Sequence, residues 1–115
     1  MVEMNPVAEV LFFAWYTYAV DGEALGVVGQ RWYSGQANYV PGARSIALVL
    51  YETTGGLFDS AMPAPDTVTV GTATMTFMSC DAATLAFSFN AGSNAGQAGN
   101  IALQRVGPTP ADCAF

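Results

Sequence analysis

Apolar and polar residues alternate along much of this chain with a period of two, which is typical of β-strands that bury one face. Residues 84–89 show the pattern clearly, because Leu85, Phe87 and Phe89 fall on one face and small or polar residues fall on the other. Periodicity typical of an amphipathic helix is nearly absent, and turn-forming residues separate the alternating segments. The pattern predicts seven strands, over residues 2–4, 10–19, 30–39, 45–52, 67–79, 84–89 and 100–106.

Glycine and proline mark the connections between these strands. The residues 62–66 include Pro63 and Pro65 and are expected to form a connection, because proline cannot donate the hydrogen bond that a central strand needs. Gly71 interrupts a long strand-like segment and predicts a β-bulge. The small residues of segment 90–99 predict the most mobile loop of the domain. The predicted turn pairs are Asp21-Gly22, Pro41-Gly42 and Gly55-Gly56.

Seven short strands with short connections predict a single all-β domain over residues 1–115. Strands joined in this way pair antiparallel with their neighbours in a meander. The meander is expected to form a small barrel, closed or partly open, or a barrel-like sandwich of two sheets, and the periodicity fits both alternatives. A folded chain of this length buries on the order of 65% of the surface that it exposes when unfolded, so its core needs neither metal nor cofactor.

The charge of the chain excludes several classes of partner. There are 9 acidic residues against 3 basic ones, and the formal net charge is −6. Such a chain presents no basic surface for phosphate groups, so we expect no nucleic-acid partner and no binding to an anionic membrane surface. The longest apolar run, residues 10–20, is much shorter than the ~20 residues of a membrane-spanning helix, so we expect no membrane span.

Catalysis is not expected from these residues. The chain has no histidine, and therefore lacks the commonest general base and the commonest metal ligand. Its carboxylates are scattered singly, without the spacing of a calcium loop, and are expected to be solvated or to pair with the three arginines. We therefore predict no catalytic residue, no metal site and no cofactor.

The two cysteines, Cys80 and Cys113, have neither a zinc-site spacing nor a Cys-x-x-Cys spacing. The pattern favours a disulfide that joins the C-terminal tail to the end of a strand, and two free thiols are the alternative. On the chain-entropy account such a crosslink stabilises the fold by roughly 3 to 4 kcal/mol. A disulfide in an acidic, lysine-free chain indicates an extracytoplasmic location, whether secreted, periplasmic or at the cell surface.

Aromatic residues concentrate on two neighbouring predicted strands. Because side chains alternate along a strand, one face is expected to be core and the other an exposed aromatic stripe. The stripe could stack on sugar rings or apolar ligands, or pack against a partner. The candidate ligand-binding residues are Trp15, Tyr16, Tyr18, Trp32 and Tyr33.

Arg105 has a different predicted role. It shares the phase of Ile101 and Leu103 along its strand, which places it at the rim of the core. A charge at that position needs an acidic or carbonyl partner, so we assign Arg105 a structural role.

Five short motifs in a fixed order extend over nearly the whole chain. They are Trp-Tyr pairs at residues 15–16 and 32–33, Tyr-x-x-x-Gly-Gly-x-Phe at 51–58, a glycine-to-phenylalanine strand at 71–77 ahead of Cys80, and Leu-x-Arg at 103–105. In this order they resemble an uncharacterised small all-β domain, often repeated, of secreted and cell-envelope proteins of bacteria. The resemblance implies an all-β architecture and an extracytoplasmic setting, and it implies no activity.

The start of the chain departs from that resemblance. Related domains usually carry a further strand, of the form Gly-x-Trp-Tyr, ahead of the position of Met1. Either the true start lies upstream, or the domain lacks one N-terminal hairpin strand. In the second case the strand at residues 2–4 has an unpaired edge, which favours a homodimer or a strand-exchanged assembly.

Together these observations favour an interaction or assembly module over an enzyme. The expected partner is a protein or a surface, including a second copy of the chain. The alternative is a ligand-binding or carbohydrate-binding barrel that uses its aromatic face.

Overall fold

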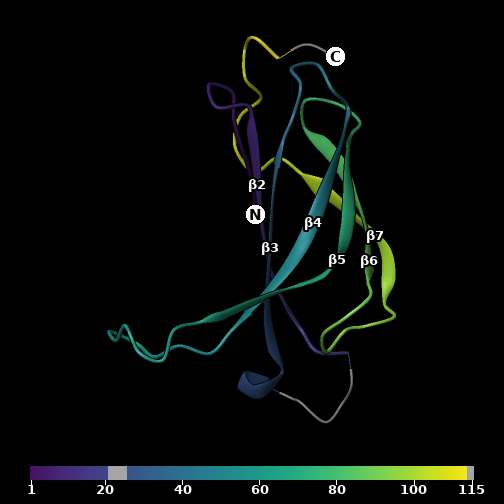
Figure 1. Ribbon diagram of the computed structural model, residues 1–115. Helices are drawn as coiled ribbons and strands as arrows, with labels where there is room; N and C mark the ends of the chain where they lie inside the picture. Colours follow the sequence, from purple (N-terminus) through teal and green to yellow (C-terminus); the bar gives the residue numbers. More distant parts are fainter. Residues whose placement is uncertain (21–25, 114–115) are drawn as a thin grey trace.

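The protein folds as one antiparallel sheet that curls into a half-barrel (Figure 1). Figure 1 shows the computed structural model, which describes residues 1–20 and 26–113; the predicted turn Asp21-Gly22 lies outside them. No helix among these residues has the length and apolar character needed to cross a membrane. The strands follow chain order across the sheet: β1 (Val2–Asn5), β2 (Val10–Tyr18), β3 (Gln30–Asn38), β4 (Ser45–Thr54), β5 (Asp66–Phe77), β6 (Ala82–Phe89) and β7 (Ala98–Gln104), with a 3-10 turn η1 (Gly26–Gly29) before β3.

The predicted fold class is confirmed. All seven strands belong to one sheet, so the partly open barrel is formed and the two-sheet sandwich is not. The strand boundaries differ from the predicted ones by a few residues; β5 ends earlier, at Phe77, and β7 begins earlier, at Ala98.

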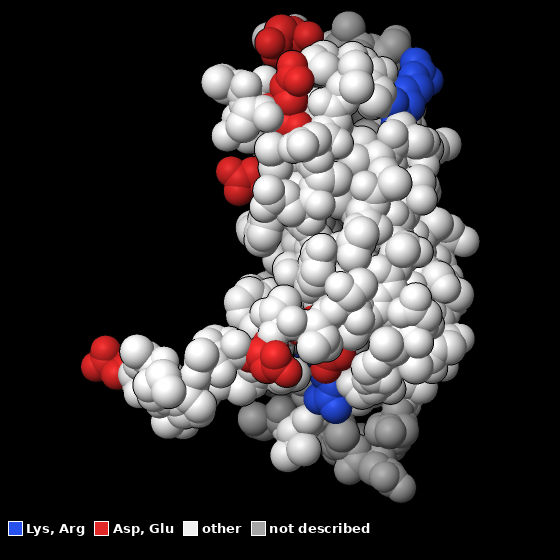
Figure 2. Space-filling view, viewed as in Figure 1, with Lys and Arg blue, Asp and Glu red and all other residues white. Residues whose placement is uncertain are grey.

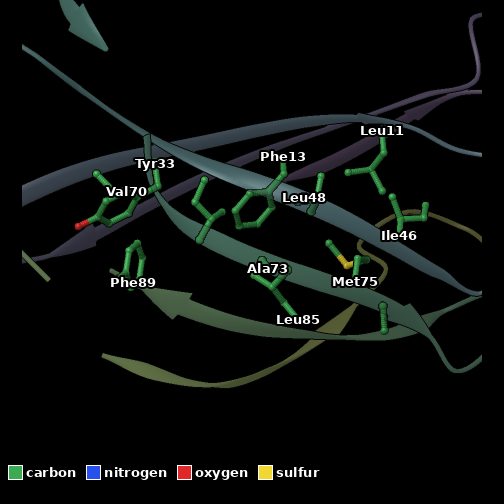
Figure 3. Close-up of a cluster of buried hydrophobic side chains, with 12 residues drawn as sticks. Leu11, Phe13, Tyr33, Ile46, Leu48, Val70, Ala73, Met75, Leu85 and Phe89 are labelled. Atoms are coloured by element: carbon green, nitrogen blue, oxygen red, sulfur yellow. The ribbon is translucent and has the colours of Figure 1, made fainter. Parts of the chain in front are cut away.

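The core lies on the concave face of the sheet. Along β4, Ile46, Leu48 and Leu50 are buried while the residues between them are exposed, as the period of two requires. Figure 3 shows Ile46 and Leu48 among side chains from other strands, including Leu11, Phe13, Met75 and Leu85, and Leu50 belongs to the same buried cluster.

A β-bulge helps the sheet to curl; its extra residue is Val70, directly before Gly71, where the bulge was predicted. The register between β4 and β5 shifts there, because Leu50 pairs with Gly71 whereas Tyr51 pairs with Thr69. A Cβ atom on Gly71 would lie 2.2 Å from the carbonyl oxygen of Ser88, so only glycine allows β6 to approach this closely. Bulges increase the local twist, which favours curvature.

Beyond the bulge the β4–β5 hairpin leaves the body as a projecting arm, which we define as residues 53–69 (Figures 1 and 2). The described pairing between β3 and β4 reaches no further than Glu52, and β6 pairs with β5 only from Gly71 onward. The base of the arm is therefore a two-stranded ribbon that has no further strand partner on either edge among the described residues, and the tip of the arm, residues 55–65, is a loop with one isolated bridge between Leu57 and Ser60. Its tip contains the expected proline connection, in which the bond between Met62 and Pro63 is cis.

The C-terminal tail is fastened to the turn between β5 and β6. Cys80 and Cys113 form the predicted disulfide, with Cα atoms 6.1 Å apart. Arg105 Nε donates a hydrogen bond to the carbonyl oxygen of Cys80 at 3.0 Å and lies 3.6 Å from Asp81 Oδ1. Arg105 thus has both kinds of partner that its position at the rim of the core requires.

The loop between β6 and β7 is held more firmly than its composition predicted. Asn94 is buried at its centre and accepts a hydrogen bond from the Val20 amide at 2.9 Å. Its side-chain amide donates to the Tyr18 carbonyl at 3.3 Å and to the Tyr33 hydroxyl at 2.9 Å. The expectation of a loosely held loop is therefore wrong for its middle, which is anchored to β2 and β3.

Candidate functional site

The half-barrel is open along a seam between its first and last strands. β1 pairs only with β2, and β7 pairs only with β6, among the described residues. The outer edge of each strand therefore carries backbone N–H and C=O groups with no strand partner. Such edges are sites at which another β-strand can add.

A groove of about 1040 Å³ lies at this seam. Its floor is apolar, and four floor residues from three strands are only partly buried, because no other described residue covers them at the seam: Trp15 of β2, Phe77 of β5, and Ile101 and Leu103 of β7. The rim is polar and includes Glu3, Asp81 and Arg105. An apolar floor with a few polar groups at the rim is typical of a binding site, and the volume is at the upper end of the ~300 to 1,000 Å³ range of small-molecule pockets.

Trp15 joins the floor of the groove to the core. Its ring centroid lies 5.1 Å from that of Phe87, in an edge-to-face arrangement, and 5.7 Å from those of Tyr33 and Phe89. Contacts of this kind hold an aromatic ring in one orientation. The groove therefore has a rigid aromatic floor at this point.

The five aromatic residues predicted to bind a ligand do not form one surface. Trp15 pairs across the strands with Tyr33 on the concave face, and Tyr16 pairs with Trp32 on the convex face. Tyr33 is 0% exposed, so the prediction that it contacts a ligand is wrong. The sequence indicated both cross-strand neighbourhoods, but the set combined residues from opposite faces of the sheet.

The convex face carries the exposed part of that set. The rings of Tyr16 and Trp32 stack, with centroids 6.1 Å apart and planes 16° apart. Both side chains are exposed, as is Tyr18 beside them. A shallow hollow of about 570 Å³ borders this stack and is also lined by Gln30 and Thr53.

A buried polar network closes the end of the half-barrel where β3 and β4 meet the β6–β7 loop. Glu52 is 7% exposed, and its Oε2 has no hydrogen-bond partner, while Oε1 lies 3.8 Å from Arg31 Nε. Arg31 also donates hydrogen bonds to Ser93 Oγ at 2.6 Å and to the Val28 carbonyl at 3.0 Å. The expected pairing of an acidic residue with arginine is found, but Glu52 is buried rather than solvated.

Tyr33 completes this network. Burial raises the pKa of the Tyr33 phenol above its ordinary value of 10.0, and the negative charge of Glu52 raises it further. Hydrogen bonds from Ser93 and Asn94 and the charge of Arg31 act in the opposite direction. This network was not predicted from the sequence. A signal for it was present, because Arg31 lies on the same face of its strand as Tyr33, and Glu52 on the same face as Leu50, so both charges were expected on the buried face.

The described residues contain no group of three or more histidine, cysteine, aspartate or glutamate side chains that could hold a metal ion. Comparison with models of protein families, with curated proteins and with solved structures finds no match. The resemblance to a small domain of secreted bacterial proteins stays a prediction. The groove at the seam is therefore the feature of the molecule that indicates a function.

Proposed function

We propose that this chain is a non-catalytic binding and assembly module that holds an apolar polypeptide segment in the groove at its seam. The observation that carries the proposal is the combination of an apolar floor with two unpaired strand edges. Burial of the floor contributes about 25 cal/mol per Å² of apolar surface. The strand edges add main-chain hydrogen bonds, which a polypeptide can use and a small apolar molecule cannot.

The polar groups at the rim support binding rather than chemistry. Arg105 is engaged with the Cys80 carbonyl and with Asp81. Asp81 Oδ1 in turn accepts a hydrogen bond from the Thr109 hydroxyl. A hydrolytic or transfer reaction needs a nucleophile and a base within hydrogen-bond reach of each other, and two of the rim groups, Arg105 and Asp81, are engaged with each other and with structural partners.

The proposed setting is extracytoplasmic. A disulfide persists in oxidising compartments and is rare in the bacterial cytosol, so the bond between Cys80 and Cys113 supports secretion, the periplasm or the cell surface. The resemblance to domains of secreted and cell-envelope bacterial proteins supports the same setting. An assembly role at a cell exterior fits both.

Trp15 provides a direct test of the groove. The Trp32→Phe variant retains Trp15 as its one tryptophan, and Trp15 lines the groove. We expect the neutral probe N-phenyl-1-naphthylamine to bind this variant saturably at submicromolar protein concentration, with energy transfer from Trp15. A further Leu103→Asp substitution should abolish binding, whereas Val40→Asp, at an exposed position outside the groove, should not. Failure of the probe to bind the Trp32→Phe protein would contradict the proposal.

A second candidate function is carbohydrate binding on the convex face. The stacked and exposed pair of Tyr16 and Trp32 favours it, since flat aromatic surfaces stack on sugar rings. Affinity electrophoresis in gels that contain soluble polysaccharides separates the two functions. Retardation that Tyr16→Ala removes and Leu103→Asp leaves intact would assign glycan binding to the convex face.

A further inference from the structure

We infer that the polypeptide segment held in the groove is the projecting arm of a second copy of this chain. The inference rests on the proposed function and names the partner of the same groove. One chain carries both an apolar hollow and an apolar projection of matching chemistry. Each lacks an apolar partner within the described residues.

The tip of the arm is an exposed apolar cluster. Leu57 is 64% exposed, Phe58 is 100% exposed and Met62 is 73% exposed. Single exposed apolar residues are common on protein surfaces, but a cluster of large ones on a projecting element is typical of an interaction site. The tip therefore presents apolar side chains that could be buried against the apolar floor of the groove.

The edges of the arm match the edges of the seam. The base of the arm, where Thr53 pairs with Thr67 and Thr54 pairs with Asp66, has no further strand partner on either side among the described residues, and each of the two strands that border the seam is paired on one side only. β7 is the better acceptor, because its seven residues include no charged residue and no proline. β1 is only four residues long, contains Glu3 and is followed by Pro6, which are features that protect an edge. We therefore place the arm along β7.

Charge favours the same placement. Asp59 is the only charged residue in segment 55–65. Arg105, whose side chain is 40% exposed, follows the end of β7 at the rim of the groove. Glu3 lies on the β1 side of the rim and would repel Asp59. Arg105 is paired there with Asp81, 3.6 Å away, so a tip that enters on the β7 side meets a neutralised pair and avoids the repulsion from Glu3.

The contact must form between two molecules. The arm continues β4 and β5 outward and away from the body, as Figures 1 and 2 show, so it does not fold back over its own seam. The donor surface and the acceptor surface therefore differ. Such a contact closes either as a reciprocal dimer, in which each arm enters the other groove, or as a ring.

Light scattering after gel filtration tests the inference with paired variants. We expect the unmodified protein to form an assembly whose mass rises with concentration. Phe58→Asp, on the arm, and Leu103→Asp, in the groove, should each weaken assembly at least tenfold, while Val40→Asp should leave it unchanged. Phe58 is fully exposed, so its substitution leaves the core intact, and circular dichroism verifies the fold of the groove variant.

Mixing the two variants gives the sharpest result. The arm variant retains an intact groove, and the groove variant retains an intact arm, so an equimolar mixture should recover a complex of one copy of each. An unmodified protein that stays monomeric up to millimolar concentration would overturn the inference, as would an assembly that survives both substitutions. If the probe still binds the groove in either case, only the identity of the partner is wrong; if it does not, the proposed function fails as well.

Discussion

At the scale of single residues, the buried polar network shifts the pKa of Tyr33. Tyr33 is fully buried, and its hydroxyl accepts a hydrogen bond from Asn94. Glu52 is close to it, because the two residues are paired across β3 and β4. Figure 3 shows Tyr33 beside Val70 and Phe89, which exclude water from the ring. The network therefore couples a neutral phenol to a nearby negative charge.

Tyr33 should make the protein sensitive to alkali. Its folded-state pKa is raised above 10.0, mainly by burial, so the folded state holds the phenol proton more tightly than the unfolded state. The resulting stability is fully present below the unfolded pKa of about 10 and is lost as pH rises through the folded value. We expect the free energy of unfolding in urea to fall above pH ~10, and to fall less in Tyr33→Phe. Equal slopes in the two proteins would contradict this assignment.

At the scale of elements, the alternation of side chains explains both what the sequence predicted and what it did not. The period of two located seven strands and the inward faces of β4 and β6, because burial of one face dictates that pattern. It did not predict the anchored loop, since Asn94 bonds to residues 61 to 76 positions away along the chain. Partners so distant are fixed by the curvature of the sheet, which local pattern does not encode.

The bulge in β5 gives an element-scale prediction. Gly71→Ala would place a methyl group 2.2 Å from the Ser88 carbonyl, which belongs to the backbone of β6 and cannot rotate away. We expect a loss of about 3 kcal/mol in the free energy of unfolding, measured by urea denaturation. Gly107→Ala is the matched control, because nothing lies within 4 Å of the added atom there. A stability of Gly71→Ala equal to that of the control would mean that β6 moves aside at little cost.

At the scale of the whole molecule, the open seam could be predicted from the sequence only in part. The departure from the family pattern left two alternatives open, and only one of them implied an unpaired edge at β1; among the described residues β1 pairs with β2 alone. The groove beside it was not predicted, because it depends on how far the sheet curls. Its floor is built from residues such as Trp15, Phe77 and Leu103. The alternation of side chains predicts that these residues face inward, but it does not predict that they are exposed at a seam.

The disulfide links the stability of the molecule to the shape of this groove. The tail between Arg105 and Cys113 supplies part of the rim, through Val106, Gly107 and Pro110. With the bond intact, the tail is held against the turn that contains Cys80 and Asp81. Without it, the described attachments are the hydrogen bond from the Arg105 backbone amide to the Asp81 carbonyl and the side-chain hydrogen bonds of Arg105 and Thr109, and the two side-chain bonds are exposed to solvent.

The double variant Cys80→Ser/Cys113→Ser should therefore lose two properties together. Its free energy of unfolding should fall by about 3 to 4 kcal/mol, as expected for a loop of this length. Its groove should also bind N-phenyl-1-naphthylamine more weakly, because a released tail no longer supports the rim beside β7. Asp112→Asn, a change in the same tail that keeps the disulfide, should alter neither property. A variant that is destabilised yet binds the probe with unchanged affinity would show that the tail supports the fold without shaping the groove.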